Sequence, residues 1–276
     1  MFRQCLWDLE EVKHNLVLFT DNHPHPMCRK IFLSSFFLLF VLFANANLNP
    51  NETLVYNGSY QLSGLLTNFA QLTMRSETMQ TSKKSYLHLS FEVSTFNKWD
   101  SYFKIRDLYE SYVEPTNYQP SLYKRNVHEG GYTKTEKYTF KPNRTITSTS
   151  KRMTKPEQTK TITIGSKTVD VVSLIYKIRL VDFSKIKVGQ ALPFTLVFDE
   201  KEYQVLIKLL GTETVSAGNL GKKECYKLAI AAKTDKLKGV NKNLIWISTD
   251  KSRIPCQIKF QIPVGVGQLT LAKATL

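Results

Sequence analysis

The sequence has few residues that could bind a metal ion or act as a catalytic base. Only two of its five histidines, His88 and His128, follow residue 46, and neither has the close spacing to another ligand that a zinc site needs. The serine elbow of hydrolases and the glycine-rich loops that bind phosphate are also absent. We therefore expect no metal, no cofactor and no enzymatic activity.

Long apolar runs are missing except for one near the N-terminus, Ile31–Phe43. It is short for a transmembrane helix, which needs about twenty residues. The run follows Arg29 and Lys30 and precedes the small residues of Ala44–Ala46. This pattern predicts a secretory signal peptide over residues 27–46, with an uncleaved anchor as the alternative.

Residues 1–26 lack the pattern of a signal peptide. We interpret them as upstream sequence ahead of a true start at Met27. A cut after Ala46 would leave residues 47–276 as the mature chain, exported to the periplasm or associated with the outer membrane.

Cysteine is scarce as well. Cys5 and Cys28 lie in the leader region, which leaves Cys225 and Cys256 in the exported chain. An export signal implies a compartment in which disulfides form, and two cysteines allow one pairing. Two buried thiols on separate strands would give the same pattern, so both alternatives stay open.

Acidic residues are outnumbered, with 23 Asp and Glu against 38 Lys and Arg, so the formal net charge is +15. Such an excess favours an anionic partner. Because the export signal removes the chain from cytoplasmic nucleic acid, we expect an envelope lipid or glycan, or an outer-membrane protein, and no nucleic acid. The oligomeric state stays open.

Alternating apolar and polar residues are abundant. In Ile254–Ile262 every second residue is apolar, which places one face in a core and the other in water. The same period recurs in residues 54–62, 87–93, 105–113, 132–140, 203–209 and 244–248. The pattern predicts a single all-β domain over residues 47–276, either an antiparallel soluble β-barrel or a strongly curved sheet.

Two segments depart from this period. In Val171–Ile178 apolar residues recur at i, i+3, i+4 and i+7 after a potential N-cap, Asp170. We therefore predict one short amphipathic helix, whose apolar face could plug the mouth of a barrel. The polar, basic segment Thr145–Lys160 contains a proline and predicts an exposed loop or mobile lid.

The stretch Val127–Tyr132, VHEGGY, could be a small active site or a bend in the sheet. His128 and Glu129 could form a base and its orienting carboxylate, but adjacent strand residues point to opposite faces. We therefore favour a bend, with Gly130 and Gly131 forming a bulge in a strand.

Three long segments, Ile105–Tyr132, Asp170–Glu213 and Ile245–Leu271, resemble an exported bacterial family catalogued as domain of unknown function 3108, frequent in Bacteroidetes. The residues that match the motifs of this family are Arg106, Asp107, Glu110, Ser111, Tyr112, Glu129, Gly130, Gly131, Tyr132, Asp170, Ser173, Ser248, Asp250, Arg253, Ile254 and Pro255. The resemblance implies a barrel-like all-β fold in the cell envelope and no known activity. Cys256 departs from it, because an aliphatic residue is expected there.

The candidate site residues follow from these motifs. We consider Arg106, Arg125 and Arg253 as candidate ligand-binding residues, since guanidinium groups bind carboxylates and phosphates well. For Arg253 we favour a structural ion pair with a nearby carboxylate, with ligand binding as the alternative. We predict structural roles for Gly130, Gly131, Tyr132, Asp250 and Pro255.

The leading functional hypothesis is a non-enzymatic module that binds or carries an apolar or anionic envelope ligand, a lipid or lipidated glycan, in the cavity of the curved sheet. The alternative is a structural or assembly factor that acts through protein contacts. A glycan hydrolase, the third hypothesis, would need two carboxylates in a cleft, and Asp107, Glu110 and Glu129 are the candidates.

Overall fold

The computed structural model describes residues 48–62, 65–82, 84–232, 243–262 and 265–276. The predicted signal peptide and the upstream extension lie outside these residues. No helix in the described part is both long enough and apolar enough to span a bilayer.

The described chain forms one sheet of 15 strands, in the order β8-β7-β6-β5-β4-β3-β2-β1-β15-β14-β13-β12-β11-β10-β9. The strands are β1 (Glu52–Leu62), β2 (Leu65–Gln80), β3 (Ser85–Thr95), β4 (Arg106–Val113), β5 (Pro120–Glu129), β6 (Tyr132–Lys141), β7 (Thr145–Arg152), β8 (Gln158–Thr163), β9 (Thr168–Val169), β10 (Ala191–Phe198), β11 (Lys201–Ser216), β12 (Lys222–Ala232), β13 (Leu244–Ser248), β14 (Pro255–Ile262) and β15 (Gly265–Thr275). The helices are α2 (Val171–Arg179) and the short 3-10 turns η2 (Asn97–Trp99), η3 (Phe183–Lys185) and η4 (Gly218–Leu220).

The sheet consists of two meanders, β1–β8 and β9–β15. Within each meander, strands that follow each other in the chain pair antiparallel, except that β9 pairs parallel with β10. The first strand pairs with the last, from Thr53 opposite Thr275 to Gln61 opposite Val266, and so joins the meanders. The predicted antiparallel all-β fold is confirmed as a curled sheet with β8 and β9 as its two edges.

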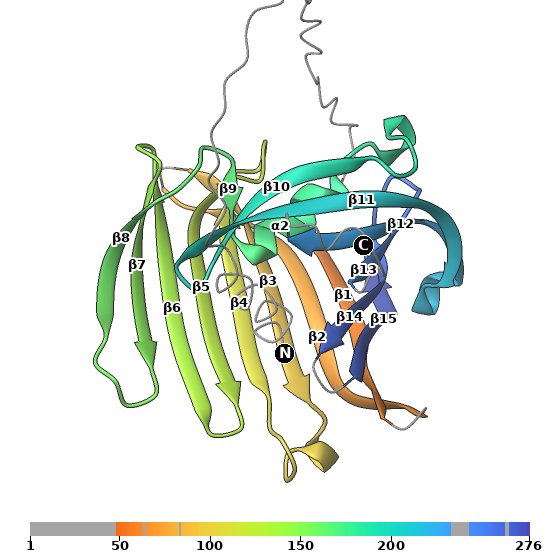
Figure 1. Cartoon of the computed structure of the whole chain (residues 1–276), viewed down its shortest axis with the longest axis horizontal. Helices are drawn as coiled ribbons and strands as arrows, with labels where there is room; N and C mark the ends of the chain where they lie inside the picture. Colours follow the sequence, from red (N-terminus) through yellow and green to blue (C-terminus); the bar gives the residue numbers. More distant parts are fainter. Residues whose placement is uncertain (1–47, 63–64, 83, 233–242, 263–264) are drawn as a thin grey trace, which may run out of the picture. The chain divides into compact units, whose positions relative to one another are not determined.

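The two faces of the sheet follow the residue alternation. In β4, Asp107, Tyr109, Ser111 and Val113 are buried on the concave face, whereas Leu108 is exposed on the outer face. The sheet curls so that β10 and β11 run across the strands of the first meander, and α2 lies between them (Figure 1). The core is therefore enclosed by both meanders together.

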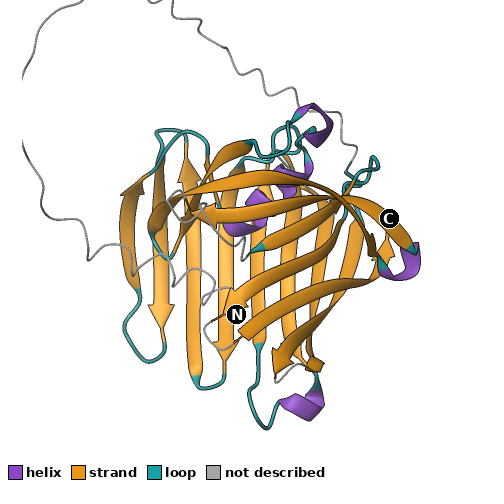
Figure 2. Ribbon diagram, turned by 45° about the vertical axis from the view of Figure 1, so that its right-hand side comes forward, coloured by secondary structure: helices purple, strands orange, loops and turns teal. Residues whose placement is uncertain are grey.

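Helix α2 begins as the sequence predicts, because the Asp170 carboxylate accepts a hydrogen bond of 2.8 Å from the backbone nitrogen of Ser173. The predicted short helix is confirmed, and its packing is more extensive than one apolar face would require. Only Ile175 and Lys177 of the helix are partly exposed, and the helix contacts β3, β4 and β10. It is an internal helix that lies within the curled sheet (Figure 2).

The predicted loop or lid over Thr145–Lys160 is corrected to a hairpin formed by β7 and β8. The segment resembles a loop because, apart from the buried Ile146, it is polar on both faces. Its alternating threonines nevertheless favour a strand, and its inward-facing Ser148 and Ser150 bind Glu200 of the second meander. Because serines replace apolar residues at inward positions, the alternation of apolar and polar residues that indicates a strand is weak in this segment.

The predicted bulge at Gly130 and Gly131 is corrected to a two-residue turn between β5 and β6, with Glu129 opposite Tyr132. Gly130 has a φ of 59°, which favours glycine. A bulge occurs instead within β11 at Gly211, where the β11–β12 register shifts.

Candidate functional site

The three predicted ligand-binding arginines lie in three different places. Arg106, half-buried at the start of β4, binds Asp100 of the preceding loop with Nη2–Oδ2 at 2.5 Å and Nη1–Oδ1 at 3.1 Å. The hydrogen bonds from Arg106 lower the pKa of Asp100. Because Arg106 also donates to the hydroxyl and carbonyl of Thr95, it holds the β3–β4 loop in place.

Arg125 belongs to a buried network on the concave face. Its Nη2 lies 3.0 Å from Glu136 Oε2 and also contacts Asp199, in the turn between β10 and β11. Lys134 Nζ lies 2.9 Å from Glu136 Oε1 and 2.6 Å from Asp199 Oδ1. Burial opposes ionisation of Asp199, but the charges of Arg125 and Lys134 outweigh it and lower its pKa to about 2.

Arg253 lies in the turn between β13 and β14. Its guanidinium is 5.1 Å from the centre of the Tyr226 ring, and its Nη2 is 3.8 Å from Asp182 Oδ1. Arg253 Nη1 is buried and has no hydrogen-bond partner in the described part of the chain. Asp250 organises the same turn by accepting hydrogen bonds from Ser248 Oγ at 3.0 Å and from the Ser252 backbone at 3.1 Å.

The predicted site residues therefore do not converge. Each arginine faces a carboxylate of its own chain, so a ligand-binding role for the three stays a prediction. Among the residues predicted as structural, Pro255 accepts a 2.8 Å hydrogen bond from the Tyr56 hydroxyl, and Tyr132 OH accepts one of 2.9 Å from Arg152.

In VHEGGY, His128 and Glu129 do not form a catalytic base and its orienting carboxylate; both residues instead interact with Asp107 of β4. His128 is exposed, and its backbone nitrogen donates a 2.9 Å hydrogen bond to Asp107 Oδ1. Burial and then the neighbouring charge of Glu129 raise the pKa of Asp107 to about 7. Glu110, the third carboxylate considered for hydrolysis, lies on the outer face and binds His88 at 2.9 Å.

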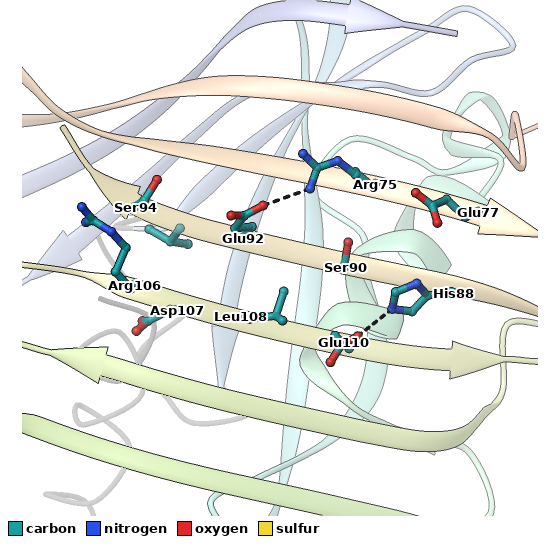
Figure 3. A pocket seen from close by; sticks show the side chains of 11 residues that line it. Arg75, Glu77, His88, Ser90, Glu92, Ser94, Arg106, Asp107, Leu108 and Glu110 are labelled. Atoms are coloured by element: carbon teal, nitrogen blue, oxygen red, sulfur yellow. Dashed lines mark hydrogen bonds and ion pairs between the residues drawn. The ribbon is translucent and has the colours of Figure 1, made fainter. Parts of the chain in front are cut away.

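A shallow hollow of about 420 Å³ lies on the outer face of β2, β3 and β4 (Figure 3). Polar and charged side chains line it and contact each other: Arg75 forms an ion pair with Glu92 at 3.0 Å, and His88 Nε2 lies 2.9 Å from Glu110 Oε1. These side chains therefore already have partners within the protein.

The outer face of β6–β8, which we call the threonine–lysine face, has a different composition. Every outward-facing residue of these three described strands is threonine or lysine: Thr133, Thr135, Lys137, Thr139, Lys141, Thr145, Thr147, Thr149, Lys151, Thr159, Thr161 and Thr163. Lys137, Lys141 and Lys151 are exposed, and none forms an ion pair with a described residue. The face is thus uniformly basic and rich in hydroxyl groups.

Cys225 on β12 and Cys256 on β14 are buried, free thiols in the structure. A hydrogen bond with Cys256, together with burial, raises the pKa of the Cys225 thiol. Such a thiol is a poor nucleophile.

The family is settled by a match over residues 55–272 to the model described as protein of unknown function DUF3108. The chain belongs to the DUF3108 family. No curated protein is significantly similar to this DUF3108 chain in sequence.

Two solved structures can be compared with the DUF3108 chain. One is a β-barrel-like protein of the domain of unknown function DUF1849 from Brucella abortus, 11% identical, with a TM-score of 0.51 over 83% of this chain and 98% of that chain. This likeness shows the fold alone. Another, from Bacteroides fragilis, has a YmcC-like fold and is 8% identical, with a TM-score of 0.30 over 83% of this chain and 97% of that chain.

Several residues of the DUF3108 motifs meet around the start of α2. Ser111 on β4 donates a 2.7 Å hydrogen bond to Asp170 Oδ2, and its oxygen lies 2.8 Å from that of Ser173. These side chains are fully buried, and burial raises the pKa of Asp170. Their contacts seat the helix against the first meander.

Sequence reasoning singled out Arg125 but missed Lys134 and Glu136, the charged residues beside it where the two meanders join. Arg125, Lys134 and Glu136 fall at the same strand parity as the buried tyrosines Tyr123 and Tyr138. That parity was the available signal, because it places all five side chains on the concave face. The carboxylate opposite them, in the β10–β11 turn, had no comparable sequence signal.

Proposed function

We propose that this DUF3108 protein is an exported, non-enzymatic protein that binds an anionic glycan of the cell envelope on the threonine–lysine face. The observation that carries the proposal is the composition of that face, where lysines without acidic neighbours alternate with threonine hydroxyls. Ammonium groups bind carboxylates and phosphates, and hydroxyl groups donate to and accept from sugar hydroxyls.

The spacing of the lysines suits an extended polymer. Lys137 and Lys141 lie four residues apart on β6, a separation of roughly 14 Å at the rise of a β-strand. Lys151 lies opposite Thr135 on the neighbouring strand. Three cations on a broad strand surface favour a chain with repeated negative charges over a small molecule.

The concave face is already occupied by the protein's own groups, which argues against an apolar ligand bound inside the curved sheet. Between the meanders this face holds α2 and the turn at Asp199 and Glu200, whose polar groups bind buried side chains. An apolar ligand at this place would have to displace the protein's own groups.

The envelope location of this proposal rests on the signal-peptide pattern of residues 27–46 and on the net charge of +15. In an exported protein the anionic polymers within reach are envelope glycans, whether free or linked to lipid. The binding face is the same in both cases.

Affinity electrophoresis through a gel containing polygalacturonate, with dextran as the neutral control, tests the proposal. We expect retardation by polygalacturonate only. Replacing Lys137, Lys141 and Lys151 together by glutamine should weaken binding by at least about tenfold, or ~1.4 kcal/mol. The matched control replaces three exposed lysines elsewhere, Lys187, Lys251 and Lys273.

Equal losses in both triple variants would show that net charge alone drives binding and would refute a role for this face. Absence of retardation by any anionic polysaccharide would refute glycan binding itself. Because the replaced side chains are exposed, their loss leaves the core packing unchanged.

A second candidate function, an assembly factor that acts through protein contacts, is favoured by the open edge at β8. This strand ends the sheet, and its residues are exposed apart from Ile162, which is half-buried. An edge strand presents backbone groups to which a partner strand can pair. A photo-crosslinker at Thr161 should trap one reproducible envelope protein, and one at Val188 should not; no product at Thr161 would remove this candidate.

Hydrolysis of a glycan is the least favoured activity. Two catalytic carboxyl groups need a gap of about 5 Å or more for the sugar or water, whereas Asp107 and Glu129 form a direct side-chain hydrogen bond. Replacing Asp107 with asparagine should therefore cause no change in any glycan-cleavage assay.

A further inference from the structure

Exposed apolar side chains gather at one end of the first meander. Tyr102 is 80% exposed, Phe103 53% and Met153 50%, and these are among the most exposed large apolar residues of the described chain. Scattered exposed apolar residues are common on proteins, but a group of them marks an interaction surface.

Three connections bring these residues together: Phe96–Lys104 between β3 and β4, Gly130–Gly131 between β5 and β6, and Met153–Glu157 between β7 and β8. We call them the loop end. They lie at the same end of the sheet, below the strands in Figure 1. The Gly130 nitrogen donates a 2.8 Å hydrogen bond to the Lys104 carbonyl, and the Met153 nitrogen donates one of 2.9 Å to that of Thr133.

The exposed aromatics are held in a fixed conformation. The backbone nitrogens of Tyr102 and Phe103 each donate a 3.0 Å hydrogen bond to the Trp99 carbonyl. The rings of Trp99 and Tyr102 lie 5.9 Å apart, and Arg106 fixes the base of the loop through Asp100. The aromatic surface therefore does not have to be ordered when a partner binds.

Exposed cations surround the aromatic rings. Lys98 Nζ lies 5.6 Å from the centre of the Trp99 ring, and Arg152 packs 5.5 Å from that of Tyr132. Lys104 and Lys155 are exposed as well. Aromatic rings flanked by Lys and Arg are typical of surfaces that enter the interface between lipid headgroups and acyl chains.

We infer that the loop end docks on the surface of an anionic phospholipid bilayer. Tyr102, Phe103 and Met153 enter the interface, and Lys98, Lys104, Arg152 and Lys155 contact the phosphate groups. The docking surface is distinct from the threonine–lysine face, so each can be removed without the other. It would hold the protein on a membrane while the face along β6–β8 stays accessible.

Hydrogen–deuterium exchange on the full chain tests this surface, because it reports local contacts even if the leader also binds lipid. Vesicles of equal parts phosphatidylglycerol and phosphatidylcholine should slow exchange in Phe96–Lys104 and Met153–Glu157 at least about tenfold, since each cation near an anionic surface contributes roughly a fivefold factor in affinity. The loop Glu114–Gln119 should be unaffected. Vesicles of phosphatidylcholine alone should give little protection.

The decisive variant combines Tyr102→Ser and Phe103→Ser, and its matched control is Val188→Ser, which removes an apolar residue 69% exposed in another loop. The double variant should lose the protection and keep the wild-type melting temperature, whereas the control keeps both. Protection that persists in the double variant, or that is equal on neutral vesicles, would overturn the inference. Loss of the protection in the Lys137, Lys141 and Lys151 triple variant would also overturn it. This variant thus distinguishes lipid binding by the loop end from glycan binding by the threonine–lysine face.

Discussion

Two buried arginines join the two meanders of the sheet, and they differ in how many of their guanidinium nitrogens have a hydrogen-bond acceptor. Arg179 of α2 binds the Glu52 carboxylate of β1 through Nη1 and Nη2, the latter at 2.9 Å. Its Nε donates to the Arg253 carbonyl at 2.9 Å and its Nη2 to that of Ser252 at 3.1 Å. Every nitrogen of this guanidinium thus has an acceptor.

Arg125 forms the second joint, with Asp199 of the β10–β11 turn, and this joint is less complete. Arg125 Nε has no hydrogen-bond partner among the described residues, and neither Glu136 oxygen accepts a well-directed one, although cations lie within 3.0 Å. The Asp199 side chain is 28% exposed. At Arg179 the two meanders are therefore held together by directed hydrogen bonds, whereas at Arg125 they are held mainly by electrostatic attraction between opposite charges.

Breaking the complete joint should have the largest effect. Arg179→Met leaves the Glu52 carboxylate buried without a cation, so we expect the free energy of unfolding to fall by about 3–5 kcal/mol. Guanidinium denaturation measures it. The double variant with Glu52→Gln should regain part of the loss, and a loss below about 1 kcal/mol in the single variant would contradict the assignment.

Breaking the charge-based joint should cost less and should depend on pH. Because the folded state lowers the pKa of Asp199 from 3.8 to about 2, this carboxylate stabilises the fold above pH ~4. Its contribution, about 2 kcal/mol, is lost as pH falls from ~4 to ~2. Asp199→Asn should lower stability at pH 7 and flatten this part of the profile, whereas an unchanged slope would show that Asp199 is not ion-paired.

A carboxyl outside both joints should have the opposite pH dependence. The folded state raises the pKa of Asp107 from 3.8 to about 7, so the protonated form is favoured and stability falls as pH rises from ~4 to ~7. Asp107→Asn keeps an acceptor for the His128 nitrogen and removes the charge. Chemical denaturation at pH 8 should show a gain of at least about 1 kcal/mol, and a loss would show that the fold does not disfavour the ionised form of Asp107.

The β5–β6 turn touches neither joint, and the smallest effect of all is expected at Gly131. At Gly130 a Cβ would meet the Phe103 ring at 3.0 Å and the φ is +59°, so Gly130→Ala should cost about 1–2 kcal/mol. At Gly131 a Cβ would meet no atom within 4 Å, and Gly131→Ala should cost less than ~0.5 kcal/mol. Equal shifts in the two thermal melts would refute the turn geometry.

Much of the fold could be predicted from local patterns. The alternation in Ile254–Ile262 corresponds to β14, and Asp170 begins α2 as expected. The Thr145–Lys160 segment was misassigned because its inward side chains other than Ile146 are polar, and Glu200, the partner of Ser148 and Ser150, lies far along the chain. Local periodicity cannot distinguish such a strand from a loop, since the apolar part of the alternation is reduced to one residue.

The candidate site was less predictable than the fold. The sequence singled out Arg106, Arg125 and Arg253 as candidate ligand-binding residues, whereas in the structure each lies beside a carboxylate from a different element of this chain. The residues of the threonine–lysine face are recognisable in the sequence as threonines at every second position. It becomes one surface only when β6, β7 and β8 pair in register.

The sequence by itself determined the period of two along the chain, and with it an antiparallel sheet whose residues alternate between two faces. It also determined the basic charge and the cap of the internal helix. The tertiary structure alone decided that β1 pairs with β15 and that Arg179 and Arg125 join the meanders. The physical reason is that pairing between distant strands and burial of a charge depend on groups far apart in the chain, which no local pattern specifies.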